Sequence, residues 1–274
     1  MRRFSAYLLF VELRLQLFEF EDLPWFPRVV RAGMMDYLRF MISGLSIYQP
    51  IVPLLREALL RTGQPPHLLE LCAGAGGGTE GVLRGLRATG LPEAHVTLTD
   101  LYPQPAAWQR LAARTPGLSY AAGPVDATAV APDLPGFRTV FSAFHHFPPP
   151  LAEALLSDAV QQGAGIAVFE GSGKHWLEIV LAWTVLPVAQ LLVTPFIRPF
   201  RVSRLLLTYV VPLIPLFTIW DGMVSILRMY PPAQLLALAR RADPHGTFRW
   251  QAGKVRHWWG PQVTYLIGVP ENVA

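Results

Sequence analysis

Between residues 67 and 170 the chain alternates short apolar runs, several of them continuously apolar, with segments of helical pattern. Runs that are apolar at every position are typical of strands buried on both faces, and helices between them make such strands parallel. We therefore predict an α/β fold with a doubly wound sheet covered by helices on both faces. The predicted strands are 67–72, 96–100, 139–144 and 165–170, with helices at 79–89 and 150–162.

The regions on either side of this core have other patterns. Helical patterning precedes it, with helices expected at 29–43 and 50–61 after a mostly apolar first segment that ends near Pro24 and Pro27. Two runs after the core are almost uncharged, and strand patterning then returns, with 247–255 and 262–269 expected to pair as a hairpin around 258–261. We predict four regions: a helical N-terminal cap at 1–63, the α/β core at 64–170, an apolar helical insertion or lid at 171–243, and a terminal hairpin at 244–274.

Composition excludes several classes of protein. Of the 274 residues 52% are hydrophobic and only 15% are charged, which excludes intrinsic disorder. The single cysteine, Cys72, excludes an internal disulfide framework and a cysteine-based zinc cluster. The net charge is +4, but the arginines are scattered, so we expect no nucleic acid partner. A secretion signal is not expected, because Glu12 and Arg14 interrupt the apolar run near the start.

A glycine-rich turn at 70–79 follows the first predicted strand and leads into a helix. Such a turn lets a ligand approach bare backbone beneath a helix N-terminus, and both dinucleotides and S-adenosylmethionine use it. A dinucleotide pattern, G-x-G-x-x-G, is present at Gly76, Gly78 and Gly81, but it begins late after the strand. Glu70 favours S-adenosylmethionine, because a carboxylate can pair with the amino group of methionine and offers nothing to a pyrophosphate.

Two acids follow the next predicted strands. Asp100 ends the second strand, where a carboxylate can accept both hydroxyls of a ribose, as it does for either ligand class. Asp126, followed by Ala127, fits the end of a third strand and can accept from the amino group of adenine. The sequence therefore predicts an adenosine site at this edge of the sheet.

These motifs resemble those of the class I S-adenosylmethionine-dependent methyltransferases. The family pattern E-x-G-x-G-x-G falls on Glu70, Cys72, Gly74 and Gly76, with Cys72 in place of the first glycine. The resemblance covers the core and the terminal hairpin, and residues near 190–230 look like a bacterial subgroup of unknown substrate. It implies a Rossmann-like seven-stranded sheet with an antiparallel terminal hairpin and S-adenosyl-L-methionine as cofactor. It places the ribose contact at Asp100 and the adenine contact at Asp126 and Ala127.

The loop at 142–148 carries the catalytic candidates, His145 and His146. It follows a central strand, where ligands of α/β sheets bind, and a histidine can take a proton from a hydroxyl nucleophile. Alternatively the histidines only shape the pocket, since methyl transfer can proceed by orientation alone. Asp126 and Glu170 are conceivable metal partners for these histidines, but we expect no metal.

The predicted insertion is unusually apolar. Residues 176–197 carry one charge and 205–220 none, and the linker between them carries Arg198, Arg201 and Arg204. Prolines 187, 195, 212 and 215 are expected to break these runs, and three tryptophans suit an interface. The insertion is therefore either a shallow membrane hairpin or a soluble lid or homodimer face. We expect a cytoplasmic protein, peripheral at the inner face of the plasma membrane.

Asp221, Ser225 and Arg228 lie at i, i+4 and i+7 of one predicted helix. They form either a substrate-contacting stripe or an intrahelical ion pair with a surface arginine. The function expected overall is methyl transfer from S-adenosylmethionine to a lipophilic small molecule, at oxygen. The alternatives are an NAD(P)-dependent oxidoreductase and a membrane-associated, non-catalytic scaffold.

Overall fold

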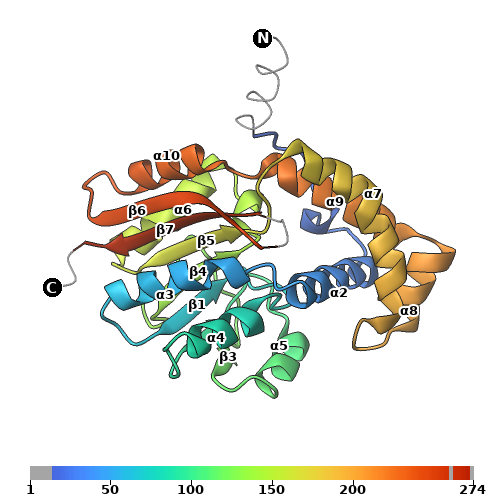
Figure 1. Cartoon of the computed structure of the whole chain (residues 1–274), viewed down its shortest axis with the longest axis horizontal. Coiled ribbons are helices and arrows are strands. Elements are labelled where there is room, and N and C mark those ends of the chain that lie inside the picture. The colour runs from blue at the N-terminus through green and yellow to red at the C-terminus, as the bar shows by residue number, and fades with distance from the viewer. Residues whose placement is uncertain (1–13, 259–261, 272–274) are drawn as a thin grey trace, which may run out of the picture. The chain divides into compact units, whose positions relative to one another are not determined.

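The computed structural model of the chain describes residues 14–258 and 262–271. The chain divides into two compact units, Met1–Gly44 with Lys174–Pro231, and Leu45–Gly173 with Pro232–Ala274 (Figure 1). The predicted cap is thus shared between the units, and the end of the predicted insertion belongs with the second unit. The start of the predicted apolar first segment, and all of the predicted hairpin loop except Trp258, lie outside the described residues.

The second unit contains one seven-stranded sheet in the order β3-β2-β1-β4-β5-β7-β6. The first five strands are parallel, and β7 pairs antiparallel with both β5 and β6. The prediction of a doubly wound, Rossmann-like sheet with an antiparallel terminal hairpin is confirmed. The strands are β1 His67–Leu71, β2 His95–Leu98, β3 Leu118–Tyr120, β4 Phe137–Phe141, β5 Ile166–Glu170, β6 Phe248–Arg256 and β7 Gln262–Pro270.

The central strands are buried along their length, because helices of the second unit cover the sheet. These helices are η2 Gln49–Ile51, α3 Val52–Arg61, α4 Thr79–Ala88, α5 Pro105–Ala112, η3 Phe144–His146, α6 Pro149–Gln161 and α10 Pro232–Ala242. From β1 the chain builds outward to β3 and then returns to β4 on the other side of β1. The strand order therefore reverses between β1 and β4, and ligands of such sheets bind outside the carboxyl ends of these two strands.

The prediction that a strand ends at Asp126 needs a correction. β3 ends at Tyr120, so Asp126 lies in the loop that follows the strand and not at the strand's end. Within this loop the Val125 N–H donates to the carbonyl oxygen of Asp100 at 2.9 Å. The backbone of the loop thus bonds to the end of β2, which keeps Asp126 in the same region as Asp100.

The first unit is helical. Its elements are η1 Phe20–Asp22, α2 Arg28–Gly44, α7 Trp176–Val193, η4 Thr194–Phe196, α8 Val202–Leu205, the π-helical η5 Leu206–Val210, and α9 Leu213–Arg228. Buried Phe26, Val30, Met34 and Ile214 form a core that joins α2 and its preceding turn to α9. A Cβ at Gly33 would lie 2.3 Å from the Ile214 Cδ1, so this glycine permits the close approach of the two helices.

Two expectations about proline in the first unit have different outcomes. The expectation that Pro187 breaks the run is wrong, because α7 continues through it; a proline removes one helical hydrogen bond without ending the helix. Pro195 lies in η4, where the long helix ends, and Pro215 lies in the first turn of α9, where backbone N–H groups lack helical partners.

Candidate active site

The glycine-rich turn joins β1 to α4 through a series of left-handed residues. Gly74, Gly76 and Gly78 have φ values of 50°, 74° and 91°, which glycine adopts at little cost. A Cβ at Gly76 would also lie 2.5 Å from the Leu111 Cδ1. The turn therefore requires glycine for both conformation and space.

Cys72 has a φ of 55°, a conformation that strains a residue with a side chain. It occupies the position where the family pattern has its first glycine, and the conformation explains that preference. Burial raises the pKa of the Cys72 thiol, and the Asp100 carboxylate adds to the rise. The thiol therefore stays protonated near neutral pH, which disfavours a nucleophilic role.

Asp100 connects the end of β2 to the glycine-rich turn. Its Oδ2 accepts from the Gly74 N–H and its Oδ1 from the Tyr102 N–H, each at 2.8 Å. Burial raises the pKa of Asp100, and these two N–H donors oppose the rise. Because each carboxylate oxygen has a second lone pair, Asp100 can still accept hydroxyl groups of a ligand.

Glu70 lies beneath the same turn and is only 2% exposed. Its Oε2 accepts from the Thr79 hydroxyl, at the first residue of α4, at 2.7 Å. Burial raises the pKa of Glu70 to about 8. Its pairing with the amino group of a cofactor stays a prediction.

Asp126 and Ala127 lie in the loop after β3. The Asp126 Oδ1 accepts from the backbone N–H and the hydroxyl of Thr128, which shapes a short turn, and Ala127 is buried. Their contact with adenine stays a prediction.

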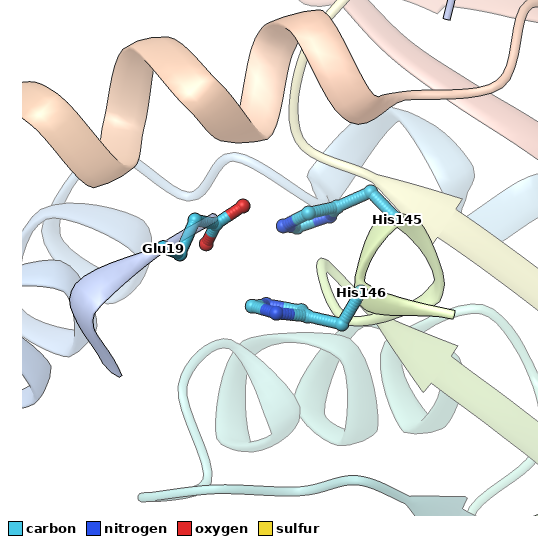
Figure 2. Close-up of side chains that lie close together, drawn as sticks. All are labelled: Glu19, His145 and His146. Atoms are coloured by element: carbon cyan, nitrogen blue, oxygen red, sulfur yellow. The ribbon is translucent and has the colours of Figure 1, made fainter. Parts of the chain in front are cut away.

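His145 and His146 form part of η3, directly after β4, and their rings lie side by side with centroids 4.3 Å apart (Figure 2). The His145 Nδ1 lies 2.8 Å from the Glu170 Oε2, and the His145 backbone N–H donates to the Glu170 Oε1 at 2.9 Å. The side chains of His145 and Glu170 are buried. An ionised carboxylate can only accept, so it holds the proton on Nδ1 and leaves Nε2 as the basic nitrogen of His145.

The sequence suggests Glu170 only as a conceivable metal partner, whereas in the structure its carboxylate orients His145. The signal that could have found it is its place at the end of β5, the neighbour of β4 in the sheet. A carboxylate there shares the edge of the sheet with the loop that carries His145.

Tyr48 and Ser142 form a second contact at this edge. The Tyr48 hydroxyl lies 2.5 Å from the Ser142 Oγ, which also accepts from the Gly171 N–H at 3.1 Å. Ser142 is left-handed, with a φ of 45°, so the start of the histidine loop is tied to the end of β5 in a strained conformation. Nothing in the sequence pointed to Tyr48, because it lies 94 residues from Ser142.

The three predicted substrate residues lie on α9 of the first unit. Asp221 accepts from the N–H groups of Phe20 and Glu21, and the Ser225 hydroxyl donates to the Asp221 carbonyl. Burial raises the pKa of Asp221 to about 6. These contacts fasten η1 and its neighbours to α9.

Arg228 corrects one interpretation of that stripe. It is 3% exposed and pairs with Glu19 at 3.0 Å and with Asp22 at 2.7 Å. It is therefore a buried arginine bound to the segment before α2, and not a surface arginine in an intrahelical pair. Contact of Asp221, Ser225 or Arg228 with a substrate stays a prediction.

No family model and no curated protein matches this chain. Among solved structures, an O-methyltransferase family protein from Burkholderia thailandensis is 15% identical, with a TM-score of 0.45 over 86% of this chain and 60% of its own. The plantazolicin methyltransferase BpumL, in complex with SAH, is 9% identical, with a TM-score of 0.49 over 89% of this chain and 98% of its own. The O-methyltransferase NcsB1 from neocarzinostatin biosynthesis is 14% identical, with a TM-score of 0.49 over 89% of this chain and 59% of its own.

The chain spans about three fifths of the length of the first of these structures. Similarity with TM-scores below 0.5 and identities of 9–15% assigns neither a family nor a function to this chain. The fold assignment therefore rests on the strand order and the glycine-rich turn described above.

Proposed function

We propose that this chain is an S-adenosylmethionine-dependent methyltransferase that acts on an oxygen atom of a lipophilic small molecule. The observation that carries the proposal is the Gly74 N–H bound to the Asp100 carboxylate, after β1 and β2, beside the point where the strand order of the sheet reverses. This contact brings a left-handed glycine turn and a strand-end acid together, as binding of an adenosine ligand requires.

The dinucleotide alternative is less well supported by the packing. In that pattern the third glycine allows a helix to pack closely on a strand. A Cβ at Gly81 would meet nothing within 4 Å, so no close packing requires a glycine there. The buried acid Glu70 also suits an ammonium group better than a pyrophosphate.

In the proposed site the backbone of Gly74 and Gly76 would line the cofactor, and Asp100 would accept the ribose hydroxyls. Glu70 faces the ammonium group, and Asp126 and Ala127 face adenine. The cofactor supplies a methyl group made electrophilic by the positively charged sulfur.

The residues after β4 would serve the acceptor. The Nε2 of His145 would accept the proton of the acceptor hydroxyl, and a bound cofactor would supply the methyl group, its carbon–sulfur bond breaking as the bond to oxygen forms and a neutral thioether leaving. Glu170 holds the Nδ1 proton and stabilises the resulting imidazolium. His146, beside it, shapes the wall of the acceptor site.

An apolar acceptor fits the low charge of residues 176–220, in which Glu178 and three arginines are the charged side chains. A peripheral position at the inner face of the plasma membrane accompanies this proposal. The alternative to this membrane position is a homodimer, in which a second copy of the chain covers the apolar residues of 176–220.

Calorimetry tests the cofactor directly. We expect binding of S-adenosylhomocysteine and no binding of NAD or NADP; the reverse result would support an oxidoreductase. Incubation with methyl-labelled cofactor and a lipid extract then tests activity. Binding of the cofactor without labelled product in any extract would favour a non-catalytic scaffold.

A further inference from the structure

Unlike a surface helix of a water-soluble protein, α7 is apolar on its exposed side as well as around most of its circumference. Its exposed side is almost entirely apolar and includes Trp183, Val188 at 55% exposure and Leu192 at 67%. Its inward side carries Gln190, which is 1% exposed, and the buried Thr194 follows in η4. A soluble lid would bury its apolar residues and expose its polar ones.

The buried polar side chains connect the helices of the first unit. The Gln190 Nε2 lies 3.3 Å from the Thr218 Oγ1 of α9, and the Thr194 hydroxyl donates to the Gln190 carbonyl at 2.6 Å. The Tyr209 hydroxyl of η5 also donates to the Leu191 carbonyl. Polar contacts between helices with apolar outer surfaces are typical of helices that pack against each other in lipid.

The apolar surface continues from α7 onto the segments that follow. Exposed large apolar side chains cover both, and we call them the apolar face: Trp176, Leu177, Val180, Leu181, Trp183, Val185, Val188, Leu191, Leu192, Phe196, Phe200, Val202, Leu206, Tyr209, Val210, Val211 and Leu216. A set of this size far exceeds the scattered apolar residues of an ordinary surface. Its tryptophans and tyrosine are the residue types that favour the boundary between lipid and water.

The charges beside the apolar face are basic. Between residues 176 and 220 the sequence has three arginines and one acid, Glu178. Arg204 is buried and pairs with Asp36 at 2.5 Å, and Arg201 also lies near Asp36, whereas Arg198 is exposed. Exposed arginine beside an apolar surface complements anionic lipid headgroups.

The length and path of the chain limit how such a surface can enter a bilayer. Trp176–Phe196 is the one helix of the described residues long and apolar enough to cross a membrane, with a mean hydropathy of 1.9. The chain enters this unit at Lys174 and leaves it at Pro231, and both flanking segments belong to the second unit. The returning pair, Val202–Val210 and Leu213–Arg228, is bent by 80°, so it counts as a span only if the bent pair is taken as one.

We infer that the apolar face inserts into one leaflet of an anionic phospholipid bilayer, with Arg198 at the headgroups and both ends of the insertion on the same side. The inference extends the proposed function by giving the lipophilic acceptor a source, the bilayer. It stands apart from that function, because insertion requires neither cofactor nor catalysis.

Flotation with vesicles of phosphatidylglycerol and phosphatidylcholine tests the face. We expect the wild-type protein to float and the double variant Val188→Glu, Leu192→Glu to remain at the bottom of the gradient. A matched control, Leu60→Glu with Leu151→Glu, changes two equally exposed leucines on α3 and α6 of the second unit and should still float. Arg198→Glu should lower the floated fraction, most clearly at low salt.

Several outcomes would overturn the inference. A wild-type monomer that ignores vesicles would show a closed, soluble unit. A concentration-dependent dimer, without flotation, that the Val188→Glu, Leu192→Glu variant abolishes would show that the face binds a second copy. Equal flotation of that variant and the control would show that another surface binds lipid.

The one-leaflet geometry has its own test. A fluorescent NBD label on Ser203→Cys, in a Cys72→Ala background, reports the side of the membrane on which the linker end lies. We expect external dithionite to quench the label on intact vesicles, and protection from dithionite would indicate that α7 spans the bilayer. Circular dichroism and thermal unfolding serve as folding controls for every variant.

Discussion

The Nδ1 of His145 lies 2.8 Å from the Glu170 Oε2; His145 follows β4, and Glu170 ends the neighbouring strand β5. The second Glu170 oxygen accepts the His145 backbone N–H, so one carboxylate sets both the ring and the loop that carries it. A histidine held in this way presents its other nitrogen in a defined direction and tautomer, which is what a general base needs.

Glu170→Gln should lower kcat by about 10²-fold or more, because the amide no longer fixes the Nδ1 proton or stabilises the imidazolium. The affinity for S-adenosylhomocysteine should not change. Steady-state kinetics with an acceptor found in lipid extracts measures the effect, with Glu153→Gln on α6 as the control. Retention of activity in Glu170→Gln, or its loss in His146→Gln alone, would assign the base elsewhere.

Asp100→Ala should weaken cofactor binding by about 1.5–3 kcal/mol, because the ribose hydroxyls lose a charged acceptor. The substitution also frees the Gly74 N–H, so Asp100→Asn, which keeps one acceptor oxygen for that donor, should bind with intermediate affinity. Calorimetric titration with S-adenosylhomocysteine gives these values, and exposed Asp133→Ala is the matched control. Unchanged affinity in Asp100→Ala would remove this residue from the site.

Gly74→Val should abolish cofactor binding, because a β-branched residue is strongly strained at a φ of 50° and its side chain blocks the approach to the backbone. Gly81→Ala on α4 should leave binding intact, since a Cβ there meets nothing within 4 Å. Thermal unfolding separates a folded, non-binding protein from an unfolded one. A folded Gly74→Val protein with normal affinity would place the ligand elsewhere.

Cys72→Gly should raise the free energy of unfolding relative to Cys72→Ala by about 1 kcal/mol. Glycine relieves the left-handed strain at a φ of 55°, whereas alanine keeps the strain and removes only the thiol. Urea unfolding of the two variants measures the difference. Equal stabilities would show that the turn stores no strain at this position.

Glu70 should make stability fall as pH rises. Its pKa is raised to about 8 in the folded protein from an ordinary value of 4.5, so between these values the folded state holds a proton that the unfolded state has released. The free energy of unfolding therefore decreases through this window and levels off above it. Urea unfolding across the window should show this slope, and Glu70→Gln, which cannot ionise, should show less of it.

Glu70 also links cofactor binding to a proton. If the ammonium group of the cofactor pairs with the carboxylate, binding below the raised pKa should release a proton. The calorimetric enthalpy of binding should then depend on the ionisation enthalpy of the buffer. An enthalpy independent of buffer would contradict the pairing.

Local signals in the sequence determined the sheet and the glycine-rich turn. Short, mainly apolar runs predict buried parallel strands, and the structure has buried strands at β1, β4 and β5. Glycine is required where φ is positive, so the turn is visible in the sequence at Gly74 and Gly76. The sequence also places Asp100 next to the end of a strand, because such a position can be counted along the chain.

Only the tertiary structure decided which distant residues meet. The Glu170 carboxylate reaches His145 because β4 and β5 are neighbours, and Tyr48 reaches Ser142 across 94 residues of chain. The Asp221 carboxylate binds the backbone of Phe20 from a position 201 residues away. Such pairs leave no periodic trace, because each depends on packing between elements.

The polarity of α7 is the clearest case of this division. Its sequence is apolar around nearly the whole helix. The local pattern therefore shows that the helix is hydrophobic but does not determine which side faces inward. Packing against α9 selected the side that carries Gln190, since a buried amide gains a hydrogen bond with Thr218. The apolar side was thereby left outward, and no reading of the sequence alone could have determined that.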